Sequence, residues 1–225
     1  MNRFTGFNSE TNDFLVGITF NNNKEWFYEH KKMYDENVHK AITLLANEVY
    51  EKMHAYDDNF LEIPKISRIN RDLRFSKDKR PYKVSKWFFL RGDGKPDIIY
   101  PRPSFYFEIS ANTWSYGLLF WAKPAGMAKY RQMIEANRAE FENIIKKLKK
   151  NKQFLISGEK YKRIYNTDLS DELQDFAQRK ELVISSEREY TDTVVYSEEL
   201  PNFIFEEYKK LYPLYKFLLR GSLNE

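Results

Sequence analysis

Cysteine is absent from the 225 residues of this sequence. Its absence excludes disulfides, thiolate zinc sites and cysteine nucleophiles. Histidine is scarce as well: His30, His39 and His54 form no HExxH pattern, and no two of them are four residues apart. The sequence also lacks a Walker A loop, a Rossmann fingerprint, a G-x-S-x-G elbow and an EF-hand. We therefore expect no metal centre and no cofactor.

Long apolar runs are missing too. No stretch approaches the roughly 20 apolar residues that cross a bilayer, and the first twelve residues lack the apolar region of a secretory signal. We expect a cytoplasmic protein without a membrane partner. The sequence leaves the oligomeric state open.

The residues that are present favour a packed globule. Hydrophobic residues make up 42% of the chain and aromatic residues 17%, so the low mean hydropathy of −0.71 reflects the 31% of charged residues and not a shortage of core formers. The length is enough to bury a substantial core. Because we find no internal repeat, low-complexity linker or clear boundary, we expect residues 1–225 to form a single domain.

Periodicity predicts helices and strands in both halves of the chain. Apolar residues at helical spacing predict helices over residues 9–18, 38–53, 124–150 and 170–179. Asn22 with Glu25 resembles a capping box and predicts the start of another helix. A last helix is predicted from Ser197 onward, with Pro213 kinking or ending it. Alternation predicts a strand over 66–75, and aromatic-rich runs predict strands over 104–110 and 114–121, joined by a hairpin at 111–113. We further expect a short strand or a turn at 154–156, short strands over 182–185 and 193–196, and a loop at 92–96. The predicted fold class is α+β, a largely antiparallel sheet covered by helices from both ends of the chain.

Charge is distributed unevenly along the sequence. The formal net charge is only +4, yet residues 65–91 hold ten Lys and Arg against Asp72 and Asp78, a local net charge of +8. The rest of the chain therefore carries −4. This asymmetry predicts a local surface that faces an anion.

The segment RINRDLRFSKDKRPYK, residues 68–83, is the densest part of that surface. If it is extended, Ile69, Leu73 and Phe75 share one face and Arg68, Asn70, Asp72 and Arg74 the other. Arg71 interrupts the apolar face, which predicts a bend or bulge there. Arg80 precedes a proline, which favours an ordered turn over residues 76–83. The candidate anion ligands are guanidinium groups and ammonium groups, oriented by two aspartates: Arg68, Arg71, Arg74, Lys77, Lys79 and Lys83, with Asp72 and Asp78.

Four other residues are candidate contributors. Tyr82, like Phe75, could anchor the turn or stack on a base or sugar. His30, one turn after Trp26, could serve as an acid or base, and Arg131 could reach an anion near the start of its helix. Each has a structural alternative: core packing for Trp26, a partly buried structural histidine for His30, and a surface ion pair with Glu135 for Arg131. No residue is assigned a catalytic role.

Residues 68–83 resemble the signature of a family of bacterial and fungal proteins catalogued only as a domain of unknown function. Asn22-Asn23-Lys24-Glu25-Trp26-Phe27 is similar to that family's N-N-x-x-W-F element, and Arg131 with Ile134 is similar to its R-x-x-I element. The resemblance covers most of the chain. It implies a single compact domain with helices around a sheet, and it implies no established activity, substrate or catalytic residue.

Three hypotheses for function follow. In the first, which is slightly favoured, the basic segment binds a small molecule bearing phosphate or carboxylate. If the protein is an enzyme, it acts on that molecule. The second is a nucleic-acid-binding module, with lysines on phosphates and Phe75, Tyr82 or Trp87 stacking on bases. The third is that no ligand binds and the segment is an internal salt-bridge network. Whether the protein is an enzyme stays open.

Overall fold

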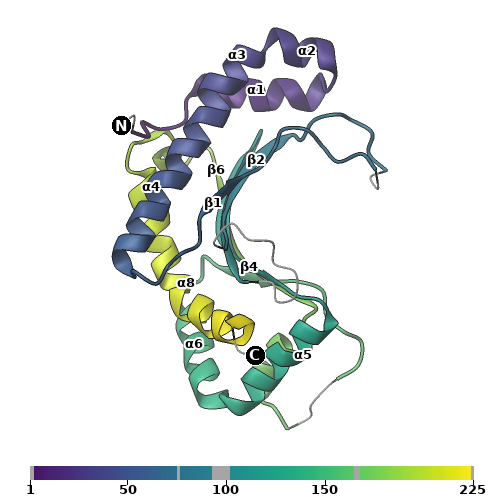
Figure 1. Ribbon diagram of the computed structural model, residues 1–225, viewed down its shortest axis with the longest axis vertical. Coiled ribbons are helices and arrows are strands. Elements are labelled where there is room, and N and C mark those ends of the chain that lie inside the picture. Colours follow the sequence, from purple (N-terminus) through teal and green to yellow (C-terminus); the bar gives the residue numbers. More distant parts are fainter. Residues whose placement is uncertain (1–2, 75–76, 93–101, 165–167, 224–225) are drawn as a thin grey trace. The chain divides into compact units, whose positions relative to one another are not determined.

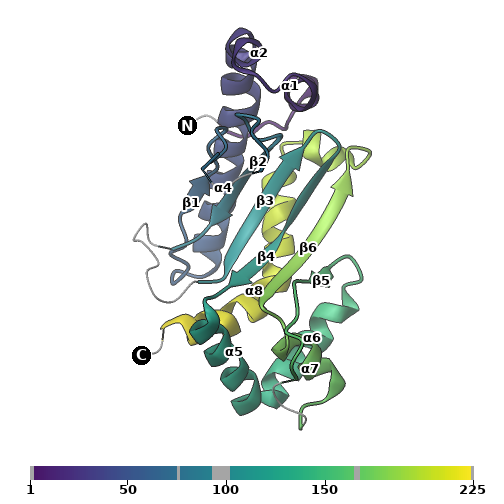
Figure 2. The ribbon, with the colours of Figure 1, turned by 90° about the vertical axis from the view of Figure 1, so that its right-hand side faces the viewer.

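One six-stranded antiparallel sheet with the strand order β1-β2-β3-β4-β6-β5 organises the chain (Figures 1 and 2). The structure, a computed structural model, describes residues 3–74, 77–92, 102–164 and 168–223. Helices precede the sheet, interrupt it and follow it in sequence. The predicted α+β class, with a largely antiparallel sheet and helices from both ends of the chain, is confirmed.

The helical elements are α1 (Ser9–Phe20), α2 (Lys24–Glu29), α3 (Lys31–Met33), the π-helix η1 (Tyr34–His39), α4 (Lys40–Tyr56), α5 (Pro124–Ala136), α6 (Arg138–Lys150), α7 (Asp171–Ala177), the 3₁₀ helix η2 (Thr193–Tyr196) and α8 (Leu200–Leu223). The strands are β1 (Pro64–Ile66), β2 (Ser85–Leu90), β3 (Ser104–Ser110), β4 (Thr113–Trp121), β5 (Leu155–Ser157) and β6 (Glu181–Glu189). In the part of the chain that the structure describes, no helix has both the length and the apolar character needed to cross a bilayer.

The chain divides into two compact units. The first comprises Met1–Leu90, Tyr106–Tyr116 and Glu187–Phe205, and the second comprises Arg91–Phe105, Gly117–Ser186 and Glu206–Glu225. Strands β3, β4 and β6 and helix α8 contribute residues to both. The single domain expected from the sequence remains a prediction.

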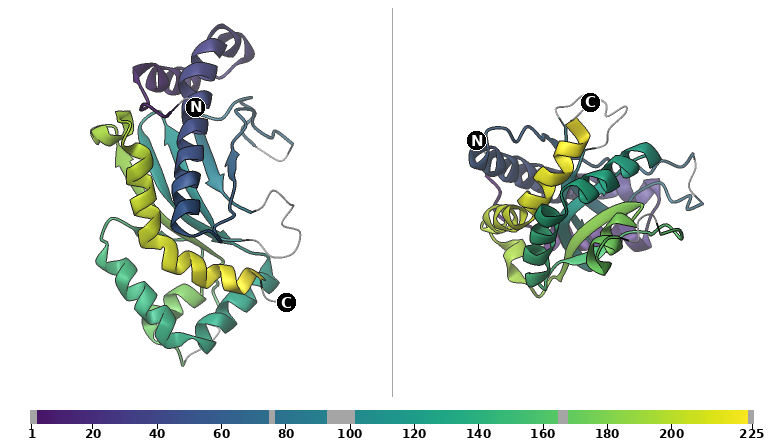
Figure 3. Two further views of the ribbon diagram at one scale, coloured as in Figure 1. Left: turned by 60° about the vertical axis from the view of Figure 1, so that its left-hand side comes forward. Right: turned by 90° about the horizontal axis from the view of Figure 1, so that it is seen from below.

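In the first unit, α4 packs on β1 and β2 (Figure 3). Its buried residues repeat every three or four positions, as the sequence predicted: Ile42, Leu45, Ala46, Val49 and Met53. Strand β2 alternates strictly between half-buried and buried residues, so Lys86, Phe88 and Leu90 are buried while Trp87 and Phe89 point to the opposite face. The side chain of Asn8 caps α1 at the backbone N–H of Thr11, and each of these residues accepts the other's backbone N–H.

In the second unit, the long helix predicted over residues 124–150 is wrong in one respect, because it breaks at Asn137. There φ is −129° and ψ 40°, and α5 ends before α6 begins. The Asn137 side-chain amide and its backbone N–H both donate to the carbonyl of Met133, at 3.0 Å each. The side-chain bond is open to asparagine in a non-helical conformation, and apolar periodicity does not register it.

Two predictions near the C-terminus concern residues 193–196 and Pro213. Residues 193–196 form the 3₁₀ helix η2 and not a strand, because the Asp192 side chain caps the turn at the backbone N–H of Val194. Pro213 lies inside α8 and does not end it.

The predicted hairpin between residues 104–110 and 114–121 is confirmed, with β4 beginning one residue early. Residues 93–96 of the predicted loop lie outside the described residues.

Candidate functional site

Residues 68–83, here called the basic loop, connect β1 to β2 in the first unit. The predicted strand over 66–75 is wrong: β1 ends at Ile66, and pairing with the next strand stops at Ser67, whose backbone N–H donates to the carbonyl of Trp87 at 2.8 Å. Beyond that point one isolated bridge, Asn70 with Tyr82, joins the two legs of the loop. Phe75 and Ser76, which belonged to the predicted strand and turn, lie outside the described residues.

The two aspartates explain why the loop is not a strand. The Asp72 carboxylate accepts the backbone N–H of Arg74 at 3.1 Å, and the Asp78 carboxylate accepts that of Arg80 at 3.0 Å. Each is a local bond from a side chain to the backbone two residues on, which competes with ladder pairing. The polar residues that suggested one face of a strand therefore build two turns instead.

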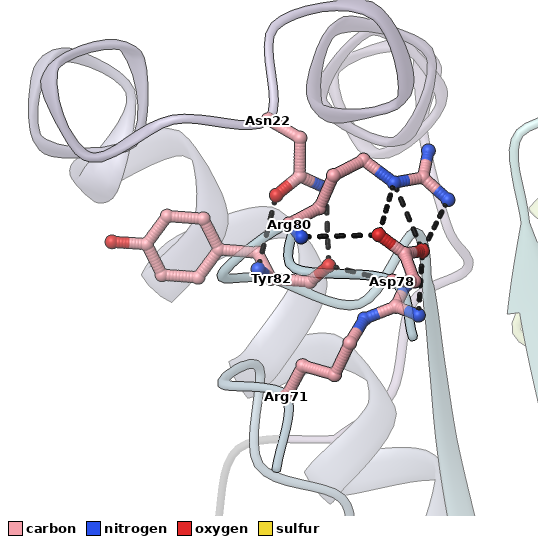
Figure 4. Close-up of polar contacts among 5 residues, drawn as sticks. All are labelled: Asn22, Arg71, Asp78, Arg80 and Tyr82. Carbon is pink, nitrogen blue, oxygen red and sulfur yellow. Dashed lines mark hydrogen bonds and ion pairs between the residues drawn. The ribbon is translucent and has the colours of Figure 1, made fainter. Parts of the chain in front are cut away.

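The loop is anchored at Tyr82 (Figure 4). Asn22 accepts the backbone N–H of Tyr82 and donates its amide to the Tyr82 carbonyl, both at 3.0 Å. The Tyr82 ring is buried, 5% exposed, and stacks on Phe27 with 4.3 Å between ring centroids. Asn22 is thus not the helix cap that the sequence predicted. Asn23 caps α2 instead, accepting the backbone N–H of Trp26 at 2.9 Å.

Asp78 joins two arginines from opposite legs of the loop (Figure 4). Its carboxylate lies 2.8 Å from Nη1 of Arg71 and 2.7 Å from Nη2 of Arg80, and it also accepts Nε–H of Arg80. The hydrogen bonds from Arg80 and the charge of Arg71 hold the pKa of Asp78 well below its usual range. Arg71 further donates toward the Tyr82 carbonyl at a long 3.5 Å. Arg80 is not among the anion ligands predicted from the sequence.

Asp72 pairs with Arg74 and forms a separate, more exposed cluster. The Arg74 guanidinium forks onto both carboxylate oxygens, at 3.0 and 2.7 Å. The side chains are 78% exposed for Arg74 and 58% for Asp72, so water screens the pair. The hydrogen bonds from Arg74 lower the pKa of Asp72. The three predicted arginines therefore do not share one aspartate: Asp78 holds Arg71, and Asp72 holds Arg74.

The remaining cations lie along the surface of the loop. Lys79 donates to the carbonyl of Leu73 at 3.2 Å, and Lys83 donates to the carbonyl of Arg68 at 2.9 Å. Burial, with the charges of Arg71 and Arg68, lowers the pKa of Lys83. The side chains of Arg68 and Lys77 are exposed. The loop thus carries seven cations and two carboxylates, and each carboxylate is already engaged by arginine.

The other predicted contributors make different contacts. Trp26 and His30 stack on each other at 4.0 Å, and Nδ1 of His30 lies 2.8 Å from the Trp26 carbonyl. Arg131 is in the second unit, on α5, where it is 8% exposed and lies 5.3 Å from the ring centroid of Tyr161. Its burial does not fit the surface ion pair with Glu135 considered above. These are the contacts described for the three residues, and a role for them in ligand binding stays a prediction.

A buried cation was not predicted at all. Lys86 on β2 is 1% exposed and donates to the Tyr34 hydroxyl at 2.7 Å and to the carbonyl of Ser67. Burial, and then the charge of Lys83, lowers its pKa to about 8. Burial also lowers the pKa of His39, whose ring stacks on Tyr34, and Lys86 adds to that shift. The alternation of β2 could have revealed this lysine, because position 86 falls on the same face as Phe88 and Leu90.

Two cavities lie in the first unit away from the loop. One of about 400 Å³ and one of about 1100 Å³ share Arg3, Phe4 and Leu44 in their walls. The larger is rich in carboxylates, contributed by Glu48, Glu51, Glu198 and Glu199. Neither of these two cavities is lined by a residue of the basic loop.

A comparison with protein families now places the chain. The model of the conserved hypothetical protein family DUF2461 matches residues 10–217. The chain belongs to this family. The matched region of the DUF2461 protein contains the whole basic loop, together with Asn22 and Arg131. No curated protein matches the chain.

Proposed function

We propose that this DUF2461 protein binds an anionic ligand, bearing phosphate or carboxylate, through the basic loop. The observation that carries the proposal is the position of Asp78 between Arg71 and Arg80. One carboxylate neutralises one of two guanidinium charges and fixes both side chains, so the pair keeps a net charge of +1 in a defined geometry.

Arg80 is the group best placed to meet such a ligand. Its side chain is 48% exposed, and Asp78 engages its Nε and Nη2. Nη1 points away from Asp78 in Figure 4 and has no partner in the described part of the chain. Lys77 and Lys79 lie one to three residues away in the same loop and are exposed. An anion at this edge of the loop would meet a guanidinium already oriented by its carboxylate, which lowers the entropy lost on binding.

Inorganic tripolyphosphate and citrate are suitable probes for the two anion classes. A ligand that binds only the folded state stabilises it by about 2.7 kcal/mol when present at one hundred times its dissociation constant. We expect such stabilisation in thermal unfolding, and we expect Arg80→Gln to abolish it. Arg220→Gln is a matched control, because Arg220 is 51% exposed and pairs with Glu140 at 2.7 Å, as Arg80 pairs with Asp78. Equal responses of both variants and the unmodified protein would refute the proposal.

A second function is favoured by one specific observation. Both carboxylates of the loop are saturated by arginine from within the loop, which is the arrangement of a purely structural ion-pair network. In that case Arg80→Gln changes the free energy of unfolding, and neither probe changes the unfolding temperature of any variant. The same titration therefore separates the two functions.

A further inference from the structure

The face of β2 turned away from α4 forms a surface beside the basic loop. Trp87 and Phe89 lie on this face, half-buried, with 4.6 Å between ring centroids. The ammonium group of Lys83 lies 5.1 Å from the Trp87 ring centroid. In Figure 2, which looks onto this face, α4 lies behind β2. The basic loop therefore leads directly into a pair of aromatic rings.

The register of β1 adds a second lysine to this surface. Lys65 is the direct partner of Phe89 in the antiparallel pair, and directly paired residues project to the same face of a sheet. Lys65 therefore lies beside Phe89, as Lys83 lies beside Trp87. We call Lys65, Lys83, Trp87 and Phe89 the aromatic–lysine face; all four belong to the first unit.

One acidic group bounds this face on the next strand. The carboxylate of Glu108 on β3 accepts the hydroxyl of Ser85 at 2.6 Å. A negative charge there disfavours a polyanion over β3. A phosphate-bearing chain is therefore directed along the β1–β2 edge, between the two lysines and toward the basic loop.

We propose that the ligand of this surface is a single-stranded nucleic acid, with phosphates on the basic loop and the lysines and with bases stacked on Trp87 and Phe89. This inference rests on the proposed anion binding and specifies the ligand. Rings set in a sheet face receive bases only when the bases are unstacked, which a duplex does not offer. A small anion makes no use of the rings, whereas a chain of nucleotides can contact the basic loop and the rings at the same time.

The test is binding of a short fluorescent oligothymidylate, measured by anisotropy, against an abasic strand with the same number of phosphates. Base stacking on aromatic side chains changes affinity by about tenfold or more. We expect the abasic strand to bind at least about tenfold more weakly, and a duplex to bind more weakly than the single strand. Equal affinity of the intact and abasic strands would overturn the inference, and this comparison needs no altered protein.

Variants then locate the contact. We expect Trp87→Leu with Phe89→Leu to weaken oligothymidylate binding about tenfold or more and to leave tripolyphosphate binding unchanged. Trp121→Leu, at an exposed tryptophan of β4, should change neither. Tripolyphosphate binding without any oligothymidylate binding refutes the nucleic-acid ligand and leaves the proposed function intact. Failure of oligothymidylate, tripolyphosphate and citrate alike refutes both proposals.

Discussion

The Asp78 cluster and Lys86 place positive charge in the first unit in opposite ways. Arg71 and Arg80 stay near the surface, 24% and 48% exposed, and share the carboxylate of Asp78. Lys86 is buried, and its described polar partners are a hydroxyl and a backbone carbonyl, with no carboxylate. The two arrangements are only a few residues apart in the sequence.

The two arrangements differ in whether their positive charge changes with pH. An arginine remains charged at any ordinary pH, and its aspartate stays ionised because the hydrogen bonds lower its pKa. A buried lysine with neutral partners gives up its proton more easily, so its pKa falls to about 8. The surface cluster thus keeps its charge at ordinary pH, whereas burial lowers the pKa of Lys86 to about 8.

The largest expected effect concerns the anchor that connects the loop to the core. Replacing buried Tyr82 by Ala removes the stacking on Phe27 and leaves a cavity, so we expect a loss of about 3 kcal/mol in the free energy of unfolding. Denaturant unfolding measures this loss. Tyr82→Phe keeps the ring and should be near the unmodified protein. A loss below about 1 kcal/mol for Tyr82→Ala would show that the loop is not anchored there.

The second prediction concerns the pH dependence of stability due to Lys86. Below about pH 8 the buried side chain of Lys86 is charged in the folded protein. Between about pH 8 and its ordinary pKa of 10.5, Lys86 is neutral in the folded protein and protonated in the unfolded chain. Stability due to this group therefore rises with pH, by about 2 kcal/mol between about pH 8 and 10. Lys86→Met should lack this rise. Unfolding curves of the two proteins across that range give the difference, and parallel curves would contradict it.

A smaller effect separates the two neighbouring asparagines. Asn22→Ala leaves the backbone N–H of buried Tyr82 without its partner, and we expect a loss of about 1.5 kcal/mol. Asn23→Ala removes a helix cap, which costs about 1 kcal/mol. Only Asn22→Ala should also weaken tripolyphosphate binding, because it alone releases the basic loop. Thermal unfolding with and without the probe tests both statements.

The smallest effects lie within the exposed ion pairs. Asp78→Asn should lower stability more than Asp72→Asn, because Asp78 joins two legs of the loop and Asp72 joins residues two apart. Since the folded pKa of Asp78 is depressed, its contribution is present above the unfolded carboxyl pKa of about 3.9 and is lost as pH falls through the folded value. Acid unfolding of the two variants should therefore differ, and equal curves would refute the bridging role.

Local patterns predicted much of the fold. The apolar repeat of α4, the aromatic-rich strands β3 and β4, and the turn between them are all confirmed. The predictions are wrong where a polar side chain forms a hydrogen bond with the backbone of a nearby residue. Asn137 does so inside an apolar repeat, and Asp72 does so in the basic loop. Hydrophobic periodicity carries no information about such bonds.

The sequence by itself determined the charge density of residues 68–83 and the pairing of Asp72 with Arg74, because both are local along the chain. Only the tertiary structure decided that Asp78 joins Arg71 to Arg80, that Asn22 holds a tyrosine sixty residues away, and that Lys86 is buried. These contacts depend on which segments the sheet and α4 bring together. Spacing along the chain does not predict these contacts, because the fold sets the distance between residues that are far apart in sequence.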